Sequence, residues 1–335
     1  MRRRVFLAGA FARIEAHPFA DAIRALSAAE TGPAGADNFV TNEDSFGRIC
    51  GRIGREVPTG VYLGVGPDQN LSYVAHARPS RAFVVDFRRK NMLVHLLHKA
   101  LFTLADDRVG YLSRLMARRI DPSADDPIAA AEAAEFEPSR LGKAVDEVRS
   151  ALDPLGLLNA ADWPTLATIQ ARLAGPGLSA RFLALPMYPT VGQLIRKPDA
   201  DGRPAHYLST DPLYRAVRDL QRADGVVPII GDYGAPSGLD RLARRLKDRG
   251  ERVSLVYLSD VEDFLLRGGR FGPYVDNLNS LPIAEGAMIA RTSTRSIDHP
   301  ARARGDLSTT ILASLPRFLD AAKAGRIRRP ADLFA

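Results

Sequence analysis

Short apolar runs that end in an acidic residue are the feature that most constrains the fold of this chain. Residues 82–86 read Ala-Phe-Val-Val-Asp, and the runs at 226–232 and 253–260 likewise end in Asp232 and Asp260. Runs of this length are typical of parallel strands that are buried on both faces. Segments with the periodicity of amphipathic helices separate them. We therefore expect an α/β fold in which helices cover both faces of a parallel sheet.

The strand pattern also divides the chain. Core strands are expected at 60–64, 82–86, 226–232, 253–260 and 287–291, with a short additional strand at 182–185. The section between the second and third core strands, residues 121–225, is rich in helix and loop and predicts a long helical insertion that caps the strand ends. The other expected parts are an N-terminal helix and loop (1–37), the two parts of the core (38–120 and 226–295) and a C-terminal helix within 296–335, at about 307–324.

Composition excludes several classes of protein. Of the 335 residues, 46% are hydrophobic and 25% are charged, the balance of a soluble globular protein with a sizeable core. No apolar run approaches the roughly 20 residues that span a bilayer. The net charge of +7 comes from basic residues spread along the whole chain, not clustered with aromatic residues, which argues against nucleic-acid binding. Cys50 is the only cysteine, so an intrachain disulfide and a cysteine-based zinc site are both excluded.

The first residues have some features of a secretory signal. Three arginines, residues 2–4, precede an apolar stretch of eight residues, Val5 to Ala12. Eight residues are at the short end for the core of a signal peptide. We interpret this segment as an amphipathic helix and expect a cytoplasmic protein, with export as the alternative.

A glycine loop identifies the expected ligand site. In an open parallel sheet, ligands bind beyond the carboxyl ends of the strands. Gly64-Val65-Gly66 follows the first strand and precedes a helix, and its glycines permit a sharp turn and a close approach of the ligand. Asp86 lies 20 residues after Gly66, the separation expected of a carboxylate that binds ribose hydroxyls. The sequence therefore predicts a site for a molecule that contains a ribose.

Two residues beside this loop decide between cofactors. Gln69 stands where the dinucleotide fingerprint has glycine or alanine, and Asp68 places an anion where a diphosphate would lie. S-adenosylmethionine has no phosphate and carries an ammonium and a sulfonium group, so it is favoured over NAD. The lysine of a P-loop is absent, which argues against ATP hydrolysis.

The motifs also carry a family resemblance. The stretches 61–66, 83–86, 229–233 and 255–260 follow in order the strand motifs of class I S-adenosylmethionine-dependent methyltransferases. Through residues 39–45, 62–70, 231–233 and 257–262, the chain more closely resembles an uncharacterised bacterial family of methyltransferase-like proteins. The resemblance implies a Rossmann-like core of the class I methyltransferase type. The residues that we expect to bind the cofactor are Gly64, Val65, Gly66, Asp68, Asp86, Phe87, Asp232, Tyr233 and Ser259.

The chain departs from that family pattern at three points. Asp68 replaces the usual third glycine, and Tyr62 stands where an acidic residue is usual. After Arg291, too little chain remains for the usual last two strands with a helix between them. These departures bear on catalysis more than on the fold.

Methyl transfer requires in-line placement of an acceptor and a base where the acceptor is protonated. Asp260 and Glu262 are the expected bases, and Asn42 and Glu43 are expected to close over the ligand. Each has a structural alternative, because Asp260 also suits a helix N-cap and the 42–45 segment suits the cap of a helix that begins near Ser45.

Three functions remain open. The first is a methyltransferase that acts on an unknown small molecule, and the second is a non-catalytic Rossmann-like protein that binds a nucleoside-like ligand or a partner protein. The third, an NAD-dependent oxidoreductase, is disfavoured by Asp68 and Gln69. His95 and His98 lie three residues apart on an apolar helix, but the sequence places no third ligand, so we expect them to pack in the core and predict no metal site.

Overall fold

A six-stranded sheet forms the centre of the molecule. The computed structural model describes residues 17–31, 38–295, 297 and 299–335. The strand order is β3-β2-β1-β4-β5-β6, and every neighbouring pair is parallel except β5 and β6, which are antiparallel. The expected α/β fold with a mostly parallel sheet is therefore confirmed. The strands are β1 (Val61–Gly64), β2 (Arg81–Asp86), β3 (Val226–Ile230), β4 (Val253–Tyr257), β5 (Ile283–Ser293) and β6 (Thr309–Ser314).

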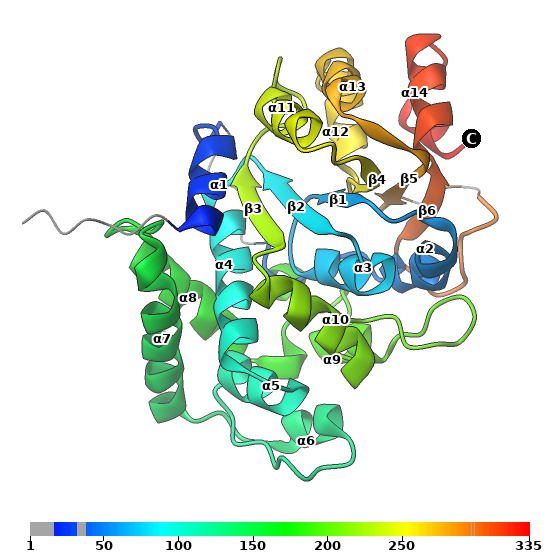
Figure 1. Ribbon diagram of the computed structural model, residues 1–335. Coiled ribbons are helices and arrows are strands. Elements are labelled where there is room, and N and C mark those ends of the chain that lie inside the picture. The colour runs from blue at the N-terminus through cyan, green and yellow to red at the C-terminus, as the bar shows by residue number, and fades with distance from the viewer. Residues whose placement is uncertain (1–16, 32–37, 296, 298) are drawn as a thin grey trace, which may run out of the picture.

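Helices cover both faces of this sheet (Figure 1). On one side lie α11, α12, α13 and α14, and on the other lie α2, α3, α4 and α10. This arrangement explains why β1, β3 and β4 are buried along their whole length and contain almost only apolar residues. The helices are α1 (Pro18–Leu26), α2 (Cys50–Glu56), α3 (Gln69–Ala77), α4 (Arg89–Leu104), α5 (Arg108–Met116), α6 (Pro127–Ala133), α7 (Pro138–Leu152), α8 (Asp162–Ala174), α9 (Val191–Arg196), α10 (Asp211–Arg222), α11 (Asp240–Asp248), α12 (Val261–Arg267), α13 (Phe271–Ser280) and α14 (Leu315–Lys323).

The C-terminal part differs from the expected single helix at 307–324. Residues 309–314 form β6, which pairs antiparallel with β5 in the register Arg291 with Ile311. Three consecutive β-branched residues, Thr309 to Ile311, favour a strand there. The helix begins only at Leu315, where the Ser314 hydroxyl accepts a hydrogen bond from the Arg317 amide at 3.4 Å.

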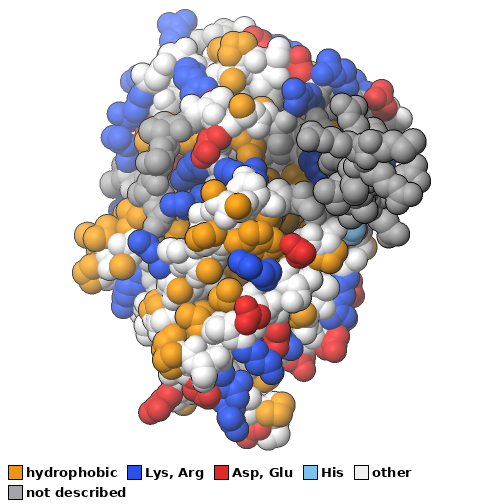
Figure 2. Space-filling view, turned by 90° about the vertical axis from the view of Figure 1, so that its left-hand side faces the viewer, with side chains coloured by type: hydrophobic (Ala, Val, Ile, Leu, Met, Phe, Trp, Pro, Cys, Tyr) orange, Lys and Arg blue, Asp and Glu red, His pale blue; other side chains and the backbone are white. Residues whose placement is uncertain are grey.

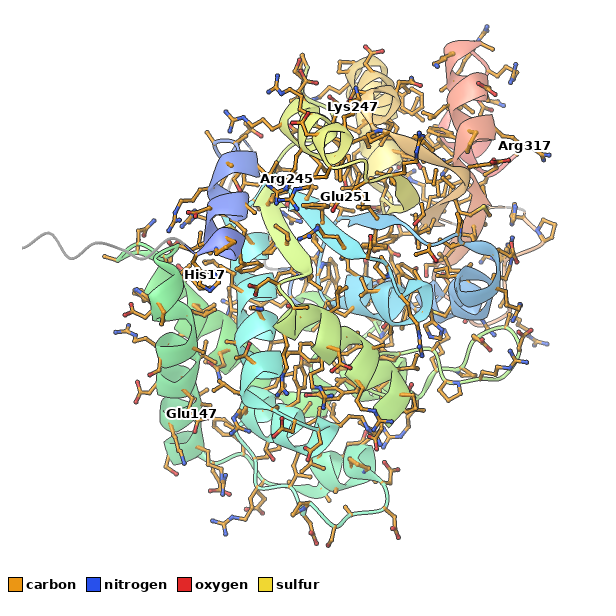
Figure 3. The ribbon with its side chains drawn as sticks, viewed as in Figure 1. His17, Glu147, Arg245, Lys247, Glu251 and Arg317 are labelled. Carbon is orange, nitrogen blue, oxygen red and sulfur yellow. The ribbon has the colours of Figure 1, made fainter. Side chains whose placement is uncertain are left out.

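The long section between β2 and β3 stacks as a second helical layer. Helices α5, α7 and α8 pack against α4, so that α4 is enclosed between the sheet and this layer (Figure 1). The layer is tied together by Glu147 of α7 (Figure 3), whose carboxylate lies 3.0 Å from the Arg114 guanidinium of α5. Enclosure on all sides accounts for the burial of nearly every α4 residue from Asn91 to Phe102.

Two expectations within this section are altered. The short strand expected at 182–185 is wrong, because Phe182–Ala184 forms a 3₁₀ turn in which Leu183 has a φ of +49°. Helix α10 falls inside the range 121–225 that we expected to cap the strand ends, yet it packs on α3 and α4 beside the sheet.

The described surface is mixed in character. Figure 2 views the side on which α7 and α8 lie and shows basic side chains distributed among apolar and acidic ones, not gathered in one patch. None of the helices in the described ranges combines the length and the apolar character needed to cross a membrane.

Lys99 of α4 joins three elements and provides a test of this packing. Its buried ammonium lies 2.5 Å from the Asp224 carboxylate, also donates to the carbonyl of Gln221, and sits 5.0 Å from the ring centroid of Phe19 in α1. Lys99→Ala should lower the free energy of unfolding by about 2–3 kcal/mol, because it leaves a carboxylate and a buried carbonyl without their donor.

The matched control is Lys143→Ala on α7. The Lys143 side chain is 79% exposed and its ion pair with Glu147 spans 3.8 Å, so the variant should lose less than about 0.5 kcal/mol. Urea unfolding followed by circular dichroism measures both values. Equal losses in the two variants would show that Lys99 does not anchor α1 and α10.

Candidate functional site

The glycine loop lies at the end of β1, where the backbone leaves the sheet for α3. A Cβ atom on Gly64 would lie 1.9 Å from the Asn70 side-chain oxygen, so no larger residue fits there. Gly66 has a φ of +82°, and no atom of the described residues lies within 4 Å of the position that its Cβ would take. Gly64 is therefore required by packing, whereas Gly66 is required by its backbone conformation and leaves open space beside the loop.

Asn70 and His95 determine the shape of this loop. The Asn70 amide donates to the carbonyls of Val65 at 2.8 Å and Pro67 at 2.6 Å, and Nε2 of His95 lies 2.9 Å from the Gly66 carbonyl. The Tyr62 hydroxyl donates to the Asn70 oxygen at 2.8 Å. The sequence predicted no role for Asn70 and only a packing role for His95. An amide side chain four residues after the second glycine of the loop is the signal that would have indicated the role of Asn70.

Asp86 lies at the end of β2, buried and already paired. Its carboxylate accepts from the Arg88 guanidinium at 2.9 and 2.8 Å and from the Arg88 amide at 3.0 Å. Because two of these three hydrogen bonds reach Oδ1, the Oδ2 atom accepts only one of them. Phe87 is half-buried, with the Arg88 guanidinium 5.2 Å from its ring centroid. The carboxylate that we expect to bind ribose therefore lies at the end of β2, and Arg88 fixes its orientation.

Asp68 lies at the start of α3, half-buried beside the loop. The Tyr207 hydroxyl donates to its Oδ2 at 3.1 Å. Burial raises the pKa of Asp68 to about 6, and the hydrogen bond from Tyr207 opposes this shift without cancelling it. The carboxylate therefore changes charge close to neutral pH.

Asp232 and Tyr233 follow β3 and point in different directions. Tyr233 is buried, and its hydroxyl donates to the Gly64 carbonyl at 3.0 Å. The side chain therefore reaches from the end of β3, past β2, to the glycine loop at the end of β1. Asp232 accepts from the Arg270 guanidinium at 2.5 Å and from the Gly234 amide at 2.9 Å. Tyr233 is therefore part of the loop region, whereas Asp232 fastens the segment between α12 and α13.

Glu43 is the centre of a buried polar network. Its carboxylate accepts hydrogen bonds from the Gln69 amide at 3.0 Å, from the Thr292 hydroxyl at 2.5 Å and from the Ser259 hydroxyl. Burial raises the pKa of Glu43, and these three donors oppose the shift. The Ser259 backbone has a φ of +55°, a conformation that costs a non-glycine residue about 1 kcal/mol. The Glu43 carboxylate therefore connects three parts of the fold: α3, the residue that follows β4, and β5.

The network corrects one alternative for the 42–45 segment. Ser45 makes no capping hydrogen bond to the 3₁₀ turn that follows it. Its hydroxyl instead lies 2.7 Å from the Ser308 hydroxyl and 2.8 Å from the Thr310 hydroxyl, and Asp44 accepts from the amides of Leu307 and Ser308. Asn42 is half-buried next to these residues. This segment therefore holds β6 in place.

The two expected bases differ in their surroundings. Glu262 is buried in an ion pair with Arg291 at 2.7 Å and accepts from the Tyr274 hydroxyl at 2.7 Å, so its carboxylate is engaged in structural contacts. Among the described residues, the Asp260 carboxylate makes only long contacts, 3.4 Å to Ser259 and 3.3 Å to Thr294, and no helix-capping bond. Burial raises the pKa of Asp260.

Asp260 also lines a cavity. Ser259, Asp260 and Thr292 contribute to a space of about 270 Å³ beyond the carboxyl ends of β4 and β5. The far wall of the cavity comes from the C-terminal segment that includes Arg329 and Phe334. Within the described ranges, no group of three or more His, Cys, Asp or Glu residues is arranged to hold a metal ion.

The role of Glu43 can be tested by an isosteric change. In Glu43→Gln, the amide group faces hydroxyls and an amide that already donate, so at least one donor loses its acceptor. We expect a loss of about 2–3 kcal/mol in the free energy of unfolding. Glu56→Gln removes an exposed carboxylate paired with Arg52 and should cost about 0.5 kcal/mol or less. Chemical denaturation of both variants is the measurement, and a neutral Glu43→Gln would refute the network.

The two glycines should respond differently to the same change. Gly64→Ala places a methyl group on the Asn70 oxygen and should prevent folding or cost more than about 3 kcal/mol. Gly66→Ala meets no atom and should cost only the roughly 1–2 kcal/mol of its left-handed backbone. Thermal unfolding of both variants decides the matter, and the reverse order of stability would contradict this description of the loop.

Comparison with known proteins places the whole core in one family. A family model described as "Domain of unknown function (DUF7790)" matches residues 38–331, which include all six strands. No curated protein matches the chain. The matched region covers most of the 335 residues. The chain is therefore a member of the DUF7790 family.

Proposed function

We propose that the chain binds S-adenosylmethionine at the carboxyl edge of β1 and β2 and acts as a methyltransferase on a small acceptor. The proposal rests on one observation: the described residues leave open space at Gly66, on the same edge of the sheet as Asp86. Gly64 pairs with Val84 in the sheet, so Gly66 and Asp86 each lie two residues beyond the same pair. A nucleoside-like ligand placed against the loop can therefore reach the carboxylate.

The residues at this edge suit that cofactor. The Oδ2 atom of Asp86 accepts one hydrogen bond from Arg88 and retains a lone pair for a ribose hydroxyl. Asp68, ionised above about pH 6, offers a negative charge to an ammonium or sulfonium group. The Tyr233 hydroxyl supports the loop by donating a hydrogen bond to the Gly64 carbonyl. When bound, the cofactor supplies an electrophilic methyl group.

Asp260 is the residue best placed to act as the base. Glu43 and Glu262 are engaged by three and two neighbouring side chains, whereas the Asp260 contacts are long. Asp260 lines the cavity, as Glu262 also does. Burial raises the pKa of Asp260, which makes its carboxylate a stronger base. An acceptor hydroxyl or amine in the cavity gives its proton to Asp260.

A second function is favoured by the same contacts. Two of the expected catalytic residues, Glu43 and Glu262, are buried and engaged in hydrogen bonds or an ion pair within the protein. A protein that binds a nucleoside-like ligand without turnover needs only the loop and Asp86. This alternative shares the binding site and differs in the absence of methyl transfer.

Calorimetric titration with S-adenosylmethionine, S-adenosylhomocysteine and NAD tests the binding step. The first two should bind, and Asp86→Asn should weaken them at least about tenfold, equivalent to about 1.4 kcal/mol, because the neutral amide holds the ribose less well. NAD should bind more weakly than either, since Asp68 repels its diphosphate.

The control is Asp121→Asn, which changes an exposed carboxylate between α5 and α6. This variant should leave the affinities for all three ligands unchanged. Circular dichroism of each variant establishes that it is folded. Absence of binding of both sulfur-containing ligands to the folded wild-type protein would refute the proposed cofactor. Tighter binding of NAD would favour an oxidoreductase.

A further inference from the structure

A line of four hydrogen-bonding side chains leads from the glycine loop into the protein interior. It begins at Asp68 and passes through the hydroxyls of Tyr207 and Tyr111 to Nδ1 of His98 on α4. The three successive distances are 3.1, 3.2 and 2.6 Å. Tyr207, Tyr111 and His98 are all at most 2% exposed, so bulk water does not compete for these contacts.

Counting hydrogens shows that this line has two self-consistent states. Three gaps need three hydrogens, but the two tyrosines supply only two. The third comes either from a protonated Asp68 or from Nδ1 of His98. If Asp68 is protonated, every hydroxyl donates toward His98, which then carries its hydrogen on Nε2. If Asp68 is ionised, every hydroxyl donates toward Asp68, and His98 carries its hydrogen on Nδ1.

The mixed arrangements are unfavourable. An ionised Asp68 with hydrogen on Nε2 of His98 leaves one gap with two facing lone pairs and no hydrogen. A protonated Asp68 with hydrogen on Nδ1 places two hydrogens in one gap. Because Tyr207, Tyr111 and His98 are buried, bulk water does not repair a fault between them.

The surrounding groups keep the imidazole neutral while the carboxylate titrates. Burial lowers the pKa of His98 to about 3, assisted by the charges that His95 and His206 would carry. Burial raises the pKa of Asp68 from its usual 3.8 to about 6. Tyr214 packs on Tyr111, and Asp86 acts on the neighbouring His95. The preference of the fold for neutral Asp68 therefore holds at low pH and is lost as the pH rises through about 6.

We propose that Asp68, Tyr207, Tyr111 and His98 form a proton relay, in which ionisation of Asp68 reverses all three hydrogen bonds and moves the hydrogen of His98 from Nε2 to Nδ1. In this step the carboxyl proton passes to Tyr207, the Tyr207 proton to Tyr111, and the Tyr111 proton to Nδ1. The Nε2 proton then passes to a water molecule that reaches the ring, so that one proton is lost to solvent in total and no other bond changes.

The far end of the relay is suited to this exchange. Nε2 of His98 is buried without a hydrogen-bond partner among the described residues, so no described side chain holds its proton in place. The relay connects the charge of the glycine loop to helix α4 at the centre of the molecule. This inference goes beyond the proposed function and does not depend on which ligand the loop binds.

Nitrogen-15 NMR of the histidine rings tests the relay directly, because Nδ1–H and Nε2–H tautomers have different ring-nitrogen shifts. Between about pH 4.5 and about pH 8, His98 in the wild-type protein should change from the Nε2–H to the Nδ1–H form, with its midpoint at the pKa of Asp68, about 6. In Asp68→Asn, the side chain does not titrate, so the His98 tautomer should be the same at every pH in this range.

A second variant separates the relay from a local effect of charge. Tyr207→Phe preserves the ring but removes the hydroxyl that joins Asp68 to Tyr111, so the His98 tautomer should no longer follow the ionisation of Asp68. Tyr188→Phe, outside the line, should behave as the wild type does. A His98 tautomer that is constant across the pH range in the wild-type protein, or that changes equally in Asp68→Asn, would overturn the proposal.

Discussion

The buried carboxylate of Glu43 is the constraint on which the rest of the sheet edge depends. A carboxyl group with an exposed fraction of 1% is stable only where hydrogen bonds replace those to the water that it has lost. Here the donors come from Gln69 on α3, Ser259 after β4 and Thr292 on β5. Any displacement of one element therefore leaves a buried polar group with too few partners. The glycine loop, which precedes Gln69 directly, is positioned by the same requirement.

The sequence predicted the sheet well and the polar contacts poorly, for a physical reason. Apolar runs such as 82–86 report burial along one strand, and burial is a local property that a continuous pattern reveals. The partners of Glu43 lie 26 to 249 residues away, and nothing in their own segments distinguishes them from other polar residues. For the same reason, the expected base Glu262 gave no sign of its pairing with Arg291. Residues 309–314 were misassigned because three β-branched residues adjoin a helix without a break.

The expected cofactor residues differ in how fully the fold already uses them. Gly66 leaves open space, and Asp86 retains accepting capacity on one oxygen, whereas Asp232 is bound by Arg270 and Gly234. A ligand at this edge therefore meets a carboxylate whose direction Arg88 has fixed before binding. Because the carboxylate is already oriented, less conformational entropy is lost when a ligand binds. The ligand must, however, compete with Arg88 for the carboxylate. The Arg88 pairing is consequently the contact that sets affinity at this edge.

The two buried polar systems differ in what stands at their ends. Between the carboxylates of Glu43 and Asp44 runs a line of four hydroxyls, those of Thr292, Thr310, Ser45 and Ser308. Both ends of this line accept, so four hydrogens serve five gaps, and Ser45 can donate to Thr310 or to Ser308 but not to both. Between Asp68 and His98, each end can either give or accept the third hydrogen, so two complete directions are available. The first system therefore holds the sheet edge with one gap always short of a hydrogen, and the second can change state without moving a heavy atom.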